Sequence, residues 1–272
     1  MNKFIKKYKP FTRSGMLGLI AFRANFICFL IGESLYCFIM YYVWRAVMES
    51  SPNPTFMGFT MQDMVLYLFI TFLSGYFTYS SSSGAIGEEI TDGSIAMRMI
   101  KPISYDISFL FQEIGEKIIL LSLVFVPIVV GVECYRYYVT GAIQFSPYTF
   151  LLYIISLIFA YLVSFYFNIC YGFLAFFLKN LWGSNVLKSV IVSFLSGATI
   201  PLAFLPLGLR NVLQFLPFAS LSYTPVMIYM GKYQGAQLLI SFGLQIFWVF
   251  CMWAISRLIW RAAIKRLSVQ GG

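Results

Sequence analysis

The feature that most constrains this chain is a series of long stretches without a charged residue. No Asp, Glu, Lys or Arg occurs in residues 64–87, 137–178, 189–209, 211–231 and 233–256. A helix that crosses the roughly 30 Å hydrocarbon core of a bilayer needs about 20 predominantly apolar residues. Because each stretch reaches that length, we expect an all-α protein that crosses a membrane several times.

The composition supports this interpretation. Hydrophobic residues make up 60% of the 272 residues and charged residues only 11%, whereas soluble domains contain about 25% charged residues. A soluble domain of this size could not hide so much apolar surface from water. We therefore expect residues 1–272 to form a single transmembrane domain.

Charges and turn formers between the apolar stretches predict six spans, joined on one side by loops at 48–60 and 133–147. The spans are expected at about residues 24–44, 64–82, 108–131, 149–177, 189–205 and 236–258. A shorter, mostly apolar stretch, 10–22, follows a basic start, and it is expected to lie along the membrane surface as an interfacial helix.

The net charge of +9 indicates the orientation of these spans. Lys and Arg concentrate on the cytoplasmic side of membrane proteins. With the amino terminus inside, that side receives all of the 19 Lys and Arg except Arg45, Arg136, Arg210 and Lys232. This distribution predicts cytoplasmic termini, and it accounts for the positive charge without a nucleic-acid partner.

Residues 189–231 are long enough for two spans, but a second crossing would place the basic carboxyl-terminal residues outside. We therefore expect one span followed by a re-entrant hairpin at 206–231, which dips into the outer face and returns. Such backbone is tolerated where protein or water surrounds it. Prolines that interrupt helices are expected to shape this outer gate: Pro201, Pro206, Pro217 and Pro225.

The loop at 84–104 shows the strongest local pattern. Its apolar residues Ile86, Ile90, Ile95 and Met99 predict one face of a short helix–turn–helix on the cytoplasmic surface. Acidic residues come first and basic residues last, which matches the helix dipoles. Either this is a solvated loop that carries topology charges, or it is a docking element that a soluble partner binds.

Glu33 lies midway along the first expected span. A carboxylate at membrane depth is costly and usually faces the protein interior or a water-filled cavity. We expect it either to pair with a polar group such as Asn168 or to contact a substrate or cation in a translocation path. Glu113 and Lys117 are spaced i, i+4, so they are expected to pair on one helix face.

Several kinds of chemistry are excluded by what the sequence lacks. It contains no histidine, no GxxxxGK[ST] phosphate-binding loop and no CxxC pair among its five cysteines. Histidine-based triads and zinc peptidases are therefore excluded, and no catalytic residue, metal site or ATP site is expected in this chain.

The six expected spans, the inner loop GEEITDGSIAMRMIKPIS and the proline-broken segment SGATIPLAFLPLGLRNVLQFLPFASLSYTPVMIYMGK resemble the membrane subunit of a bacterial ABC-2 type exporter. The ending, residues 261–272, is also similar to that of small ABC-2 permeases. The resemblance implies a plasma-membrane permease that pairs with a second copy or a related permease. It also implies two ATP-binding subunits that hold ATP and Mg²⁺ on the cytoplasmic face. In that family 10–22 would be the connecting helix, and no catalytic residues carry over. The segment 84–104 would be the coupling loop, and a soluble partner would bind it around Glu88, Glu89, Asp92, Gly93, Arg98 and Lys101.

Two other functions remain open from the sequence. An ion-coupled carrier would use Glu33 as its ion site and would need no partner, although the inverted repeats typical of such carriers are not detected. A membrane scaffold protein would need neither an ion site nor an ATPase partner. The substrate is not determined, because this class moves drugs, peptides, lipids and polysaccharide precursors.

Overall fold

The structure is a computed structural model, and it describes residues 3–50, 52, 55–178 and 181–264. The described residues form helices joined by short connections, with no strand apart from one isolated bridge between Phe56 and Phe59. The helices are α1 (Lys3–Ala21), α2 (Arg23–Glu49), α3 (Met61–Thr78), α4 (Ser82–Thr91), α5 (Ile95–Met99), α6 (Tyr105–Leu120), α7 (Val126–Thr140), α8 (Pro147–Gly172), α9 (Trp182–Leu195), α10 (Leu207–Phe215), α11 (Tyr223–Tyr229) and α12 (Gly235–Ile264).

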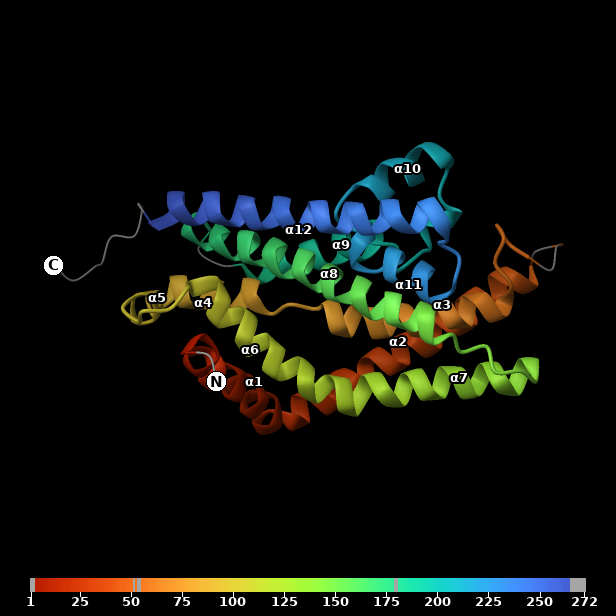
Figure 1. The fold of residues 1–272 in the computed structure, drawn as a ribbon, viewed down its shortest axis with the longest axis horizontal. Coiled ribbons are helices and arrows are strands. Elements are labelled where there is room, and N and C mark those ends of the chain that lie inside the picture. The colour runs from red at the N-terminus through yellow and green to blue at the C-terminus, as the bar shows by residue number, and fades with distance from the viewer. Residues whose placement is uncertain (1–2, 51, 53–54, 179–180, 265–272) are drawn as a thin grey trace.

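The long helices run roughly along the long axis of the molecule (Figure 1). Helices α4 and α5, the start of α1 and the last described turn of α12 lie toward one end, which we call the α5 end. The connections α2–α3, α7–α8 and α11–α12 lie at the opposite end. Both ends of the described chain therefore lie on the side of the molecule that contains α4 and α5.

Within the described ranges, five segments are long and apolar enough to cross a membrane. They are Arg23–Glu49, Met61–Thr91, Tyr105–Thr140, Pro147–Phe176 and Gly235–Ile264. Each segment corresponds to one of the six expected spans, and the expected span at 189–205 has no counterpart among the five. This confirms an all-helical protein with several membrane-length helices.

The expected fifth span differs from the structure. Helix α9 has 14 residues, about 21 Å of helix, and it ends at Leu195 rather than near 205. Gly197 has a left-handed φ of +81°, and the Ser196 carbonyl accepts a hydrogen bond from the Tyr223 N–H at 3.0 Å. The helix stops because this turn redirects the chain, so α9 alone is too short for a sixth crossing.

The third expected span is longer than predicted. Residues 133–140 are helical rather than a loop, and the helix ends only where Gly141 takes a φ of +70°. A π-helical turn at Leu121–Phe125 joins α6 to α7. Pro127 explains this turn, because a proline ring clashes with the carbonyl four residues earlier and one wider turn relieves that clash.

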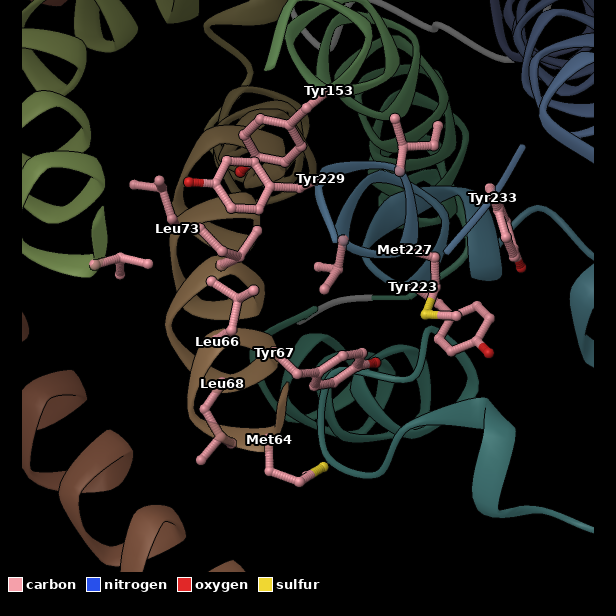
Figure 2. Close-up of a cluster of buried hydrophobic side chains, with 14 of the residues drawn as sticks. Met64, Leu66, Tyr67, Leu68, Leu73, Tyr153, Tyr223, Met227, Tyr229 and Tyr233 are labelled. Carbon is pink, nitrogen blue, oxygen red and sulfur yellow. The ribbon is translucent and has the colours of Figure 1, made fainter. Parts of the chain in front are cut away.

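The first of two hydrophobic clusters is built mainly by α3, α8 and α11. Figure 2 shows the rings of Tyr153 and Tyr229 against Leu73, and their centroids lie 5.1 Å apart. The Tyr67 hydroxyl donates to the Gly197 carbonyl at 2.6 Å. Helix α11 is buried along its whole length, so it forms part of the core rather than a surface loop.

The second cluster lies toward the α5 end. Ile86 and Ile95 pack with Phe109, Phe165 and Phe173, which joins α4 and α5 to α6 and α8. Trp260 of α12 stacks on Tyr105 with ring centroids 4.7 Å apart. Helices α4 and α5 are therefore part of the packed structure.

Helix α1 packs closely against α6. A Cβ atom added to Gly15 would lie 2.0 Å from the Gln112 carbonyl oxygen, and one added to Gly115 would lie 2.0 Å from that of Thr12. Only glycine permits such an approach, which is a common way for helices in membranes to pack. The buried Tyr8 strengthens the contact, because its hydroxyl accepts the Ser104 N–H at 3.0 Å.

We expect Gly15→Ala to destabilise the protein, because the added methyl group must push α1 away from the α6 backbone. Overpacking of this kind costs about 1–3 kcal/mol. Gly18→Ala is the matched control, since nothing lies within 4 Å of a Cβ at that position. Thermal unfolding in detergent checks the prediction, and equal midpoints for the two variants would contradict it.

Candidate functional site

The candidate site is the α4–α5 hairpin at the α5 end of the molecule. Gly93 makes the turn between the two helices with a φ of +78°. The Ser94 N–H donates to the Asp92 carboxylate at 2.8 Å, and this hydrogen bond lowers the pKa of Asp92 below its ordinary value. The structure thus has a helix, a turn and a second helix within 84–104, as the sequence pattern predicts.

Two of the six predicted partner-binding residues are bound to each other instead. Arg98 forms an ion pair with Glu89 at 2.5 Å, and both side chains are less than a fifth exposed. Arg98 also donates to the Ser108 hydroxyl at 2.9 Å, and its guanidinium lies 4.0 Å from the Phe109 ring centroid. This pair therefore holds α5 against α4 and α6.

The predicted apolar face is only partly correct. Ile86 and Ile95 are fully buried, but Met99 is exposed. An ion pair between Asp106 at the start of α6 and Arg257, at 3.1 Å, joins the helix that follows the hairpin to α12. Force applied to the hairpin would therefore reach α6 and α8 directly and α12 through α6.

The remaining predicted residues lie on the free surface of the hairpin. Glu88, Asp92 and Lys101 are exposed, beside Met97 and Ile100, whose exposed fractions are 65% and 77%. We call these five residues the hairpin tip. The exposure of Met97 and Ile100 was not predictable from the sequence. Apolar residues in a short loop resemble core positions, and only the packing shows that these two side chains face outward.

The buried charges of α6 lie behind the hairpin, and they do not form the expected direct pair. The Glu113 carboxylate accepts hydrogen bonds from the Ser80 hydroxyl at 2.8 Å, the Ser82 N–H at 3.0 Å and the Tyr161 hydroxyl at 2.9 Å. Lys117 donates to the Tyr79 carbonyl at 2.8 Å. Together they bind the backbone at the break between α3 and α4.

A second polar cluster joins α4, α8 and α9. The Lys188 ammonium donates to Ser83, Asn168 and Asn185 at 2.9, 2.7 and 2.8 Å, which uses all three of its protons. The Asn168 side-chain nitrogen donates to the Ser164 carbonyl. The expected pairing of Asn168 with Glu33 is therefore wrong: Asn168 binds Lys188 because the fold brings α9, and not α2, beside it.

The four prolines of the expected outer gate all lie at helix ends or between helices. Pro201 and Pro206 precede the short helices at Leu202–Phe204 and Leu207–Phe215, and Pro217 follows the second of these. Pro225 lies in the first turn of α11. Residues 206–231 thus form two short helices, the exposed α10 and the buried α11, on the far side of the molecule from the hairpin tip (Figure 1).

Some of the sequence predictions concern residues outside the described parts of the chain. These are Lys179, the two basic residues Lys265 and Arg266, and the similarity of 265–272 to family endings. Among the residues that are described, no group of three or more His, Cys, Asp or Glu lies close enough together to hold a metal ion.

Comparison with known protein families identifies a match over most of the chain. The profile of a family described as ABC-2 family transporter protein matches residues 35–271. This range includes the hairpin, both polar clusters and the proline-rich segment. A search of curated proteins found no match.

We expect Arg98→Ala to loosen the hairpin. The substitution removes the cationic partner of Glu89 and leaves its carboxylate only the hydrogen bond from the Tyr105 hydroxyl at 3.1 Å, at a cost of about 1–3 kcal/mol. Amide hydrogen exchange over residues 94–104 should become faster. Lys101→Ala is the control, since it removes an exposed cation from the same hairpin, and equal exchange in the two variants would count against a structural role for Arg98.

Proposed function

The chain belongs to the ABC-2 family of transporter proteins, and from this premise we propose that it is the membrane subunit of an ATP-driven exporter. A separate ATPase would bind ATP and Mg²⁺ and would use the energy of hydrolysis to drive this subunit. Two permeases, either two copies of this chain or this chain and a related one, would form the translocation path with two ATPase subunits.

The hairpin tip is the observation that supports this proposal most. It presents acidic, basic and exposed apolar side chains at one end of a helical membrane protein. An apolar centre with a charged rim is typical of a protein-binding surface. We propose that the hairpin tip, together with Gly93 at the turn, is the coupling surface. The ATPase would contact it through Glu88, Asp92, Gly93, Met97, Ile100 and Lys101.

The anchoring of the hairpin suggests how coupling works. Closure of the ATPase pair would push on the tip, and the Arg98–Glu89 pair would transmit the push to α6. The Arg257–Asp106 pair and the Trp260–Tyr105 stack would carry it to α12. A packed unit of this kind moves as a rigid body between two arrangements.

Helix α1 supports the expected position of 10–22 at the inner membrane surface. The residues that face α6 include Tyr8 and Gly15. The basic residues of the helix are all exposed: Lys3, Lys6, Lys7, Lys9 and Arg13. Cationic side chains beside an apolar stretch suit the boundary between phospholipid headgroups and acyl chains. We propose that α1 is the interfacial connecting helix.

The proposed orientation places the α5 end in the cytoplasm. The basic residues of α1, α5 and the end of α12 then lie inside, as the positive-inside rule requires. Helix α9 and the chain after Gly197 together would make the sixth crossing, and α10 and α11 would form the outer hairpin. Both termini would be cytoplasmic.

We expect Ile100→Asp to weaken the complex with the ATPase at least tenfold, because burying the new carboxylate against a partner is costly. Ile143→Asp is the matched control: Ile143 is 82% exposed, but it lies between α7 and α8 at the opposite end. The measurements are the amount of P-loop ATPase that co-purifies with each variant and the ATP hydrolysis rate in nanodiscs.

Equal retention of the ATPase by the Ile100 and Ile143 variants would overturn the coupling surface. Transport by the purified chain with no ATPase present would overturn the proposed function itself, and it would favour the ion-coupled carrier.

We expect single cysteines to show the orientation. In a variant that lacks the five native cysteines, Lys101→Cys should react with an impermeant maleimide only after the cells are permeabilised. Gly208→Cys, at the start of α10, should react in intact cells. The reverse pattern would contradict the proposed topology.

A further inference from the structure

Glu33 of α2 lies in an aromatic patch that α2 and α3 form together. Its neighbour one turn earlier, Phe29, contacts Tyr76 of α3 edge-on with ring centroids 5.5 Å apart. Tyr76 in turn contacts Phe72 at 4.9 Å. Because Glu33 follows Phe29 by one helical turn, the two side chains lie on the same face of α2. We call Phe29, Glu33, Phe72 and Tyr76 the Glu33 patch.

Both polar groups of this patch lack partners. Across the described chain, no hydrogen bond or ion pair reaches the Glu33 carboxylate, and the buried Tyr76 hydroxyl has no hydrogen-bond partner. Other carboxylates at membrane depth are satisfied: Glu113 accepts three hydrogen bonds, and Glu133 pairs with Arg136 at 2.8 Å. The Glu33 patch is therefore incomplete in the isolated subunit.

Similar clusters elsewhere indicate what is missing. Asp63 pairs with Lys232, whose ammonium lies 3.6 Å from the Phe59 ring centroid. In the same way Glu89 pairs with Arg98, which lies over the Phe109 ring. In each case a carboxylate and an aromatic face enclose a cation. The Glu33 patch has the carboxylate and the aromatic rings, but no Lys or Arg of the described chain lies over those rings.

The exposure of the patch indicates where the cation comes from. Phe29 is exposed, and Glu33, Phe72 and Tyr76 are half-buried, so the patch opens to the outside of the subunit. A carboxylate facing lipid at this depth is costly, and such groups usually face a water-filled path. An inorganic cation would need several oxygen ligands, whereas this patch offers one carboxylate, one phenol and aromatic faces.

We propose that the Glu33 patch binds an organic cation with an apolar body, and that this is the substrate class of the transporter. The carboxylate neutralises the cationic charge, and Phe29, Phe72 and Tyr76 contact the apolar body and stabilise the charge through their ring faces. An anion of the same shape is excluded by repulsion from Glu33. The assignment of this ligand as cargo rests on the proposed function, but its binding does not.

The test uses the chain with the subunits that co-purify with it, in nanodiscs, with empty nanodiscs as the blank for partitioning into lipid. We expect saturable binding of tetraphenylphosphonium and none of tetraphenylborate, which has the same shape and the opposite charge. Glu33→Gln should weaken cation binding at least tenfold. Glu49→Gln, at the exposed end of the same helix, should leave it unchanged.

Tyr76→Leu provides a second variant that keeps the carboxylate, and we expect it to weaken binding severalfold, so the proposal stays testable if Glu33→Gln does not fold. Equal binding of the two probes, or unchanged cation binding in both patch variants, would overturn the site. ATP hydrolysis by the same preparation separates the two claims. If an ATPase is coupled but no cation binds, only this inference is lost; if a cation binds but no ATPase is required, only the proposed function is lost.

Discussion

The buried carboxylate of Glu113 is the interaction on which the rest of this structure depends. The chain breaks between α3 and α4, which leaves backbone groups without helical partners. Glu113 accepts the Ser82 N–H and the Ser80 hydroxyl on one side of the break and the Tyr161 hydroxyl of α8 on another. Because an unsatisfied polar group is costly in an apolar surrounding, this arrangement fixes the position of α4 relative to α6 and α8.

The coupling role that we propose for the hairpin depends on this fixed position. Lys117 and Lys188 add further contacts to the same region, from Lys117 to the Tyr79 carbonyl and from Lys188 to Ser83. Every helix that meets the hairpin is therefore held by polar contacts as well as by the second hydrophobic cluster. A partner that pushes on the exposed tip would move packed helices rather than bend a flexible loop, as a coupling element requires.

Some elements were predictable from the sequence and others were not. The long apolar stretches predicted the helices α2, α3, α8 and α12 to within a few residues, because apolar length is a property of a local segment. The end of α9 was not predictable, since it depends on Tyr67 and Tyr223 hydrogen-bonding to Gly197 and Ser196. The continuation of α7 to Thr140 was missed because its charged and polar residues resemble a loop, although Glu133 and Arg136 pair along the helix.

By itself, the sequence determined that the protein is an all-helical membrane protein, which residues its hairpin contains and that it has no GxxxxGK[ST] motif, because length, charge and motif are properties of the chain alone. Only the tertiary structure decided which charges are available. It paired Arg98 with Glu89, joined Asn168 to Lys188, used Glu113 and Lys117 inside the subunit and left Glu33 and the hairpin tip free. The reason is physical: each buried charge takes the nearest partner that the packing offers, and several of those partners, such as Ser80 and Tyr161 for Glu113, lie tens of residues away in the sequence.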